Sequence, residues 1–100
     1  MKEQKEKSKY KFKAQDFYDL LKKQEYKCAL SGRELRPENT TAEHRKPLSD
    51  GGRHELENII LVTRDLAKVK RFLTDEAVIG LAKDIIDFRG KEIGIRVRKR

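Results

Sequence analysis

The sequence predicts an α+β domain with little sheet, in which a short antiparallel β-hairpin is packed by helices. Two short β-prone segments are joined by a loop that contains proline and glycine, and segments with apolar residues at helical spacing lie on both sides of them. The chain has 100 residues, which suits one small domain with a modest core. The predicted order is helix, hairpin, helix, helix.

The first helix is predicted over residues 14–24. Its apolar residues recur at helical spacing, and they are Ala14, Phe17, Leu20 and Leu21. Acidic residues come early in this segment and lysines come late, which suits the helix dipole. Turns are expected at Ser31-Gly32 and at residues 36–39.

The hairpin is predicted from residues 40–44 and 59–62. The first segment is short and β-prone, and the second is an apolar run rich in isoleucine and valine. Residues 47–52 contain a proline and two glycines, so they form a loop between the strands. We therefore expect an antiparallel pair.

Two helices are predicted after the hairpin. In residues 63–73 one face carries Leu66, Val69, Phe72 and Leu73, which we expect in the core, and the rest carries Arg64, Lys68, Lys70 and Arg71. Thr74-Asp75-Glu76 is typical of a helix start. The last helix is amphipathic through Ala77, Val78, Leu81, Ile85 and Phe88, and it ends near Arg89-Gly90. Residues 93–97 alternate as in a short edge strand, or form a simple tail.

Positive charge is concentrated at the two ends of the chain. The net charge is +8. Residues 1–13 contribute +4 and residues 89–100 contribute +5, which leaves −1 for the rest. We expect a flexible basic arm over 1–13, a folded domain over 14–88 and a basic C-terminal tail over 89–100. Such arms usually contact a polyanion, most often nucleic acid, although basic tails also serve solubility alone.

Cysteine content and hydropathy bear on where the protein works. Cys28 is the one cysteine, so no intrachain disulfide can form, which fits a reducing cytosol. We expect it to be a small buried apolar residue. No run of about 18 apolar residues is present, and the N-terminal residues lack the apolar stretch of a signal peptide. These features predict a cytoplasmic protein without a membrane partner.

An acid and a histidine stand side by side at Glu43-His44, and a recognisable set of residues follows them. The set comprises Pro47-Leu48-Ser49, Gly51-Gly52, then His54, Leu56 and Asn58 at alternate positions, then the apolar run and a basic helix. Phosphodiester hydrolysis needs a base for water, a cation near the leaving oxygen and positive groups on the phosphate. Over about residues 14–73 the chain resembles the HNH family of DNA endonucleases.

The resemblance implies the ββα-metal fold and assigns roles by motif position. Glu43 would ligate one Mg²⁺ or Mn²⁺, His44 would be the general base, and Asn58 would fix the loop and orient the histidine. His54 would be structural or would contact phosphate. Neighbouring strand residues point to opposite faces, so either the strand bends or one of the pair reaches the metal and the other the phosphate.

Two positions depart from the family pattern. Many members hold a structural zinc through paired cysteines, but here the four positions are Cys28, Ser31, Thr63 and Leu66, so no structural zinc is expected. The last motif residue, a His or Asn metal ligand, falls on Ala67, which has no ligand atom. Either Glu43 holds the metal with help from Asp65 and water, or Ala67 is a natural or engineered substitution that disables or weakens the enzyme.

The expected function is therefore a divalent-metal-dependent DNA endonuclease that nicks one strand of double-stranded DNA with little sequence preference. The resemblance points to an intracellular protein of a bacterium or phage. A monomer would nick, and cutting both strands would need a homodimer or two visits. The expected DNA contacts are Arg45, Lys46, His54, Lys68, Lys70 and Arg71. The alternatives are an HNH scaffold that binds DNA without cleaving it and, more remotely, an RNA-binding protein.

Overall fold

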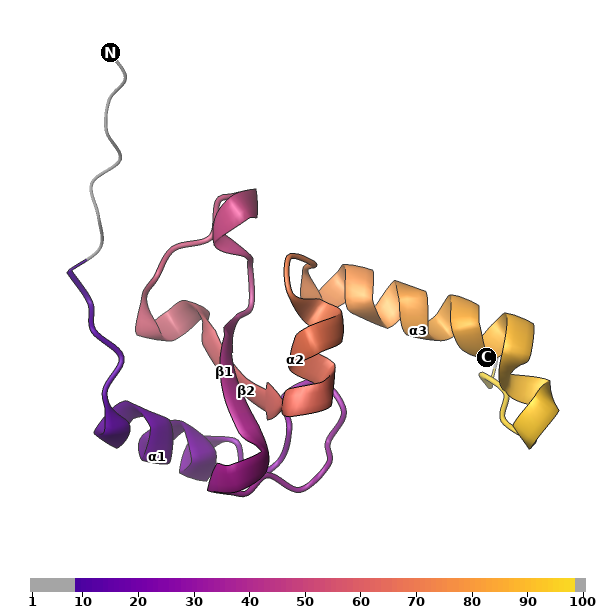
Figure 1. Cartoon of the computed structure of the whole chain (residues 1–100), viewed down its shortest axis with the longest axis horizontal. Coiled ribbons are helices and arrows are strands. Elements are labelled where there is room, and N and C mark those ends of the chain that lie inside the picture. Colours follow the sequence, from indigo (N-terminus) through magenta and orange to yellow (C-terminus); the bar gives the residue numbers. More distant parts are fainter. Residues whose placement is uncertain (1–8, 99–100) are drawn as a thin grey trace, which may run out of the picture.

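The computed structural model describes residues 9–98, and it places a two-stranded hairpin among three helices (Figure 1). In chain order the elements are α1 (Ala14–Lys23), β1 (Thr40–His44), β2 (Ile59–Thr63), α2 (Arg64–Lys70) and α3 (Asp75–Arg89). Single turns of 3₁₀ helix occur at Pro37–Asn39, Leu48–Asp50, Leu56–Asn58 and Gly90–Ile93. The predicted α+β class and the predicted order of elements are confirmed.

The hairpin pairs β1 with β2 in antiparallel register. Thr40 is opposite Thr63 at one end, and His44 is opposite Ile59 at the other. The connection between the strands is long and rises above the sheet (Figure 1). Because His44 is the last residue of β1, its side chain lies where the strand meets this connection. The fold therefore places the acid–histidine pair at the mouth of the hairpin loop.

The core forms where α1 packs against β2. Its buried members are Leu20, Leu21, Cys28, Leu35, Ile59, Ile60, Leu61, Val62 and Ala67. The side-chain amide of Gln24, just after α1, accepts from the Leu61 amide at 2.9 Å and donates to the Leu61 carbonyl at 3.0 Å. This amide satisfies backbone groups on the edge of β2 that no third strand pairs. The expectation that Cys28 is buried is confirmed.

The predicted apolar stripe of the second helix is not the face that packs against the sheet. Val69 and Phe72 have exposed fractions of 54% and 71%, so the prediction that they belong to the core is wrong. The buried residues of α2 are Ala67 and Lys70. α2 begins at the residue after β2 with no connecting loop, so the strand sets which side of the helix faces inward. Leu66 packs only at the margin of the core.

Lys70 was expected on the exposed side of the helix, and this expectation is also wrong. Its side chain is fully buried. The ammonium donates to the carbonyls of Arg45 at 2.9 Å and Leu73 at 2.8 Å. It also lies 3.1 Å from Oδ1 of Asp75, an ion pair that lacks the alignment of a hydrogen bond. These contacts offset the free-energy cost of burying the ammonium charge, which would be large if the ammonium had no partners.

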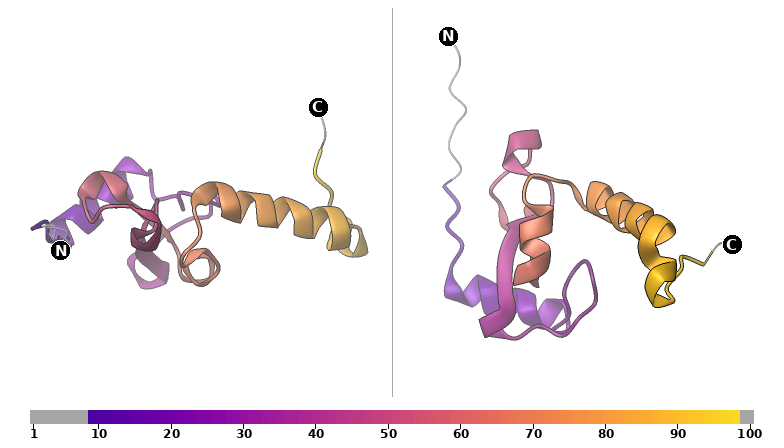
Figure 2. Two further views of the ribbon diagram at one scale, coloured as in Figure 1. Left: turned by 90° about the horizontal axis from the view of Figure 1, so that it is seen from above. Right: turned by 45° about the vertical axis from the view of Figure 1, so that its right-hand side comes forward.

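α3 extends away from the hairpin (Figures 1 and 2), and its buried residues are Asp75 and Val78. It begins as predicted, with the Thr74 hydroxyl accepting from the Ala77 amide at 3.1 Å. Of its predicted apolar face, Val78 is buried, whereas Leu81, Ile85 and Phe88 are exposed. Up to residue 98 the segment after α3 forms a 3₁₀ turn and no strand, so of the two options for residues 93–97 the tail is observed. No helix of the described part of the chain is both long and apolar enough to cross a membrane.

The folded body begins before the predicted boundary at Ala14. Tyr10 and Phe12 pack against the core, although they belong to the segment predicted as a flexible arm. Tyr10 also donates from its hydroxyl to Oδ2 of Asp16 at 2.7 Å, which ties this segment to the first turn of α1. Residues 1–8 of the predicted arm and residues 99–100 of the predicted tail lie outside the described residues.

Candidate active site

A cleft of about 620 Å³ lies between the end of β1, the hairpin loop and α2. Three positions that the sequence analysis singled out, Glu43, His44 and Ala67, line it together. Glu43 and His44 are neighbours on a strand and would point to opposite faces, but the cleft lies across the strand end and is bordered by both. Residues 24 positions apart in the sequence thus share one concave site.

Glu43 brings a partly buried carboxylate to this cleft. Among residues 9–98 the structure records no hydrogen bond or ion pair to its oxygens. Burial raises the pKa of Glu43 above its ordinary value, and the charges of Lys70 and Arg71 act in the opposite direction. A partly buried carboxylate that faces a cleft can take up a proton or a hard divalent cation.

His44 lies beside Glu43 and contacts the second histidine of the chain. Nε2 of His44 is 3.0 Å from Nδ1 of His54. Burial lowers the pKa of His44, and the nearby His54 and Lys70 lower it further. A lowered pKa keeps the imidazole neutral at physiological pH, which is the form that can accept a proton from water.

Asn58 holds the loop that carries His54 back against the end of β1. Its side-chain oxygen accepts from the Lys46 amide at 2.9 Å, and its Nδ2 donates to the carbonyls of Lys46 and Arg53, both at 2.9 Å. The Asn58 carbonyl accepts from the Arg45 amide at 2.7 Å. These four hydrogen bonds tie Asn58 to residues 45, 46 and 53, so they hold the two ends of the hairpin loop together.

The two glycines of the loop are required by its backbone path. Gly51 has a φ of 88°, in the left-handed region that other residues rarely adopt. At Gly52 an added Cβ would collide with the carbonyl group of Lys46. The close approach of Gly52 to Lys46 lets the loop fold tightly over the cleft.

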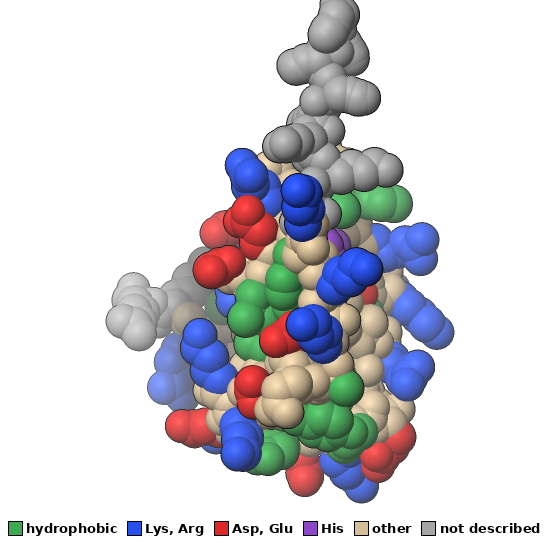
Figure 3. All heavy atoms as spheres, turned by 90° about the vertical axis from the view of Figure 1, so that its left-hand side faces the viewer, with side chains coloured by type: hydrophobic (Ala, Val, Ile, Leu, Met, Phe, Trp, Pro, Cys, Tyr) green, Lys and Arg blue, Asp and Glu red, His purple; other side chains and the backbone are tan. Residues whose placement is uncertain are grey.

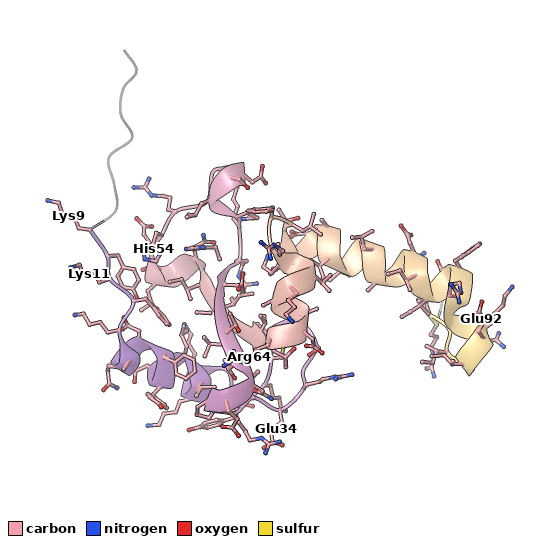
Figure 4. The ribbon with its side chains drawn as sticks, viewed as in Figure 1. Lys9, Lys11, Glu34, His54, Arg64 and Glu92 are labelled. Carbon is pink, nitrogen blue, oxygen red and sulfur yellow. The ribbon has the colours of Figure 1, made fainter. Side chains whose placement is uncertain are left out.

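The rim of the cleft along α2 is basic. Lys68 and Arg71, two of the residues predicted to contact DNA, line it together with Arg64. We did not include Arg64 among the expected contacts, although its i, i+4 spacing to Lys68 places both on one face of a helix and could have revealed it. Figure 4 shows Arg64 at the start of α2 and His54 on the hairpin loop, with Lys9 and Lys11 on the N-terminal segment.

Other predicted site residues lie elsewhere. Lys70 is buried, so it does not present its charge to a phosphate in this conformation. Arg45 donates from Nη1 to Oδ2 of Asp75 at 2.6 Å and does not line the cleft. Lys46 is exposed on the loop, also off the cleft. Of the predicted contacts, Lys68 and Arg71 are therefore the ones that line the cleft, whereas Arg45 and Lys46 are exposed away from it.

Figure 3 shows another face of the molecule, the side on which α1 and the N-terminal segment lie in Figure 1. Lysine and arginine side chains are spread there among acidic and hydrophobic ones, and only a small part of a histidine is visible. A mixed surface of this kind attracts a polyanion less than a surface of one sign.

Asp65 does not serve as a substitute ligand in this arrangement. Its Oδ1 accepts from the Thr63 hydroxyl at 2.6 Å and from the Leu66 amide at 2.7 Å. Both bonds lower the pKa of Asp65, and the bond from the Thr63 hydroxyl has the larger effect. Asp65 is not among the residues that line the cleft, so this structure does not bring it together with Glu43.

The residues present fit a weakly held divalent cation. Glu43 supplies one carboxylate, and Ala67 offers only a methyl group where a second ligand would stand. In residues 9–98 no three His, Cys, Asp or Glu side chains gather into a ready-made metal site. Mg²⁺ is often held by only one or two carboxylates, with water and substrate phosphate completing its shell, so this donor set is sparse but chemically suitable.

No protein-family model matches this chain, and no curated protein matches its sequence.

Proposed function

We propose that this chain is a divalent-metal-dependent DNA endonuclease of the HNH type that nicks one strand of double-stranded DNA. The observation that carries the proposal is the meeting of Glu43, His44 and Ala67 in one cleft whose rim is formed by Arg64, Lys68 and Arg71. An acid, a neutral histidine and a cationic rim are the groups that phosphodiester hydrolysis needs. The antiparallel hairpin followed directly by α2 is compatible with a ββα-metal domain.

Each group of the cleft has a part in this reaction. His44 accepts a proton from a water molecule. The oxygen of that water attacks the phosphorus, and the bond from phosphorus to the leaving oxygen breaks. Arg64, Lys68 and Arg71 hold the phosphate backbone and offset its charge. Asn58 keeps the loop, and with it His54, against His44.

Glu43 is the residue that would hold Mg²⁺ or Mn²⁺. The ion, when bound, supplies positive charge at the leaving oxygen. With one protein carboxylate in the shell, the affinity for the ion is expected to be low, so the concentration of metal needed for activity should be high.

The test is nicking of supercoiled plasmid in Mn²⁺ and in Mg²⁺, with EDTA as the control. This chain is assayed beside its Ala67→Asn variant, which adds an amide oxygen at the family ligand position. We expect Ala67→Asn to nick at a metal concentration at least about tenfold lower, because a protein ligand replaces water. Ala67→Val is the matched control, since it adds bulk at the same place without a ligand atom.

Three outcomes separate the possibilities. Nicking by this chain itself means that Glu43 and water suffice for the metal. Nicking by Ala67→Asn alone means that the fold is a nuclease and that residue 67 silences this copy. If neither version nicks while both bind DNA, the proposal of an active nuclease fold is wrong.

A second prediction concerns the basic rim. Lys68→Gln is expected to weaken DNA binding for all sequences alike and to reduce the slope of log affinity against log salt by about 1, because one phosphate contact is lost. Fluorescence anisotropy with a labelled duplex at several salt concentrations measures it. Lys23→Gln on α1 removes the same charge away from the cleft. Equal effects of both substitutions would mean that only net charge matters.

The second candidate function is a DNA-binding module that has kept the nuclease scaffold without the chemistry. The observation that favours it is the absence of a ligand atom on Ala67 together with the engagement of Asp65 by Thr63. The placement of Glu43 and His44 together in the cleft favours the enzyme, since a mere binding module gains nothing from an acid and a histidine there.

A further inference from the structure

The two histidines of this chain form a hydrogen-bonded pair. Nε2 of His44 and Nδ1 of His54 are 3.0 Å apart, and their ring centroids are 5.2 Å apart with the planes at 70°. The chain contains no other histidine. One nitrogen of such a contact must carry the proton and the other must accept it, so the pair has two possible directions.

His54 is held in place from two sides. The Tyr10 ring lies 5.4 Å from the His54 ring, and the Tyr10 hydroxyl is itself bonded to Asp16 at the start of α1. On the other side, the carbonyl of Arg53, the preceding residue, accepts from Asn58. His54 is therefore connected both to the N-terminal segment and to the loop anchor, which makes it a fixed partner for His44.

The contact uses one of the two nitrogens of His44. Since Nε2 faces His54, only Nδ1 remains to accept a proton from water. Among residues 9–98 the structure records no hydrogen bond to this Nδ1. If Nε2 of His44 carries the proton, Nδ1 has a free lone pair. If His54 donates instead, neutral His44 carries its proton on Nδ1 and offers no base to the cleft.

We propose that His54 is a positioning residue for His44: its Nδ1 accepts the hydrogen bond from Nε2–H of His44 and holds that ring in the tautomer whose Nδ1 can take a proton. The part that this plays in nicking rests on the function proposed above. The contact itself does not, because it belongs to the folded chain without metal or DNA; its direction is chosen as the one that leaves Nδ1 of His44 able to take a proton. The N-terminal segment takes part through Tyr10, which packs beside His54.

Nitrogen-15 NMR of the whole, metal-free chain at pH 8 tests the direction of the bond. Because the pKa of His44 is lowered, its ring is neutral at that pH. The chain has two histidines, so a variant that lacks one of them assigns the signals of the other. We expect His44 as the Nε2–H tautomer, with a ring proton protected from exchange with water. A His44 ring protonated on Nδ1, or one averaging between both tautomers, would overturn the proposal.

Two substitutions at His54 test the cause. In His54→Ala the acceptor is gone, so the His44 ring proton should exchange with water and the tautomers should mix. Asn has an amide oxygen near the place of Nδ1, so His54→Asn should restore the single tautomer. A His44 ring that is equally protected in His54→Ala would show that His54 does not position it. Amide spectra of each variant check that the chain is folded.

The same variants are then assayed for nicking, in whichever form of residue 67 is active. His54→Ala should lower kcat by about tenfold or more with KM little changed, and His54→Asn should recover most of the loss. A mixed tautomer without any loss of kcat would overturn the positioning role. If no form nicks, the proposed function fails, and the NMR result still decides whether His54 sets the tautomer of His44.

Discussion

His44→Ala is expected to abolish nicking while leaving the affinity for DNA nearly unchanged. The imidazole is the one group in the cleft whose neutral form accepts a proton near pH 7, and removing a general base typically costs about 10²–10⁴ in rate. The proposed phosphate contacts are Arg64 and Lys68 on α2 and Arg71 just after it, and the substitution does not touch them. Plasmid nicking gives the rate, and fluorescence anisotropy gives the affinity.

The control for this experiment is Ser49→Ala. Ser49 also lines the cleft, on the hairpin loop, and its hydroxyl has no part in the proposed chemistry. The Ser49→Ala variant should nick DNA at close to the rate of the parent chain. Cleavage that survives in His44→Ala would remove His44 as the base. A parallel loss of DNA binding would mean that the imidazole contributes to affinity rather than to chemistry.

Lys70→Ala is expected to lower the free energy of unfolding by about 3–5 kcal/mol, because removing one partner of a buried ion pair leaves the other uncompensated. Lys70 is fully buried, and its ammonium joins Arg45, Leu73 and Asp75. After the substitution, two carbonyls lose a donor and the Asp75 carboxylate keeps only Arg45. Urea unfolding followed by circular dichroism measures the change.

Two further substitutions isolate the cause of that loss. Lys68→Ala removes a lysine from the exposed side of the same helix, and it should change the stability by no more than about 0.5 kcal/mol. Lys70→Met keeps most of the buried stem and removes the charge, so it separates packing from the ion pair. If Lys70→Ala were as stable as Lys68→Ala, the buried network would not hold α2 and α3 to the end of β1.

The sequence predicted the local elements and much of the candidate site. The strands at 40–44 and 59–62, the helix start at Thr74 and the loop before Asn58 agree with the structure to within a residue. These features depend on residues close in sequence, such as a hydroxyl three positions before an amide or a run of β-branched side chains. Glu43 and His44 were found for the same reason, because they are adjacent in the chain.

The errors concern side-chain direction on α2. Helical spacing alone permits several inward faces, and the predicted inward face carried Val69 and Phe72. The structure turns Ala67 and Lys70 inward instead. The spacing of apolar residues cannot predict that Lys70 is buried, because its partner Arg45 is 25 residues away in the chain. Asp65 is a different case, because its donors, the Thr63 hydroxyl and the Leu66 amide, lie within two residues of it in the chain.

By itself, then, the sequence determined the order of the elements, the hairpin with its loop, the basic ends and the adjacent acid and histidine. Only the tertiary structure decided that Ala67 joins them in the cleft, that Asp65 does not, that Lys70 is buried, and that His54 and Tyr10 lie behind His44. The physical reason is the range of the interactions. Secondary structure and capping follow from contacts within a few residues, whereas burial and the pairing of His44 with His54 depend on how distant segments pack.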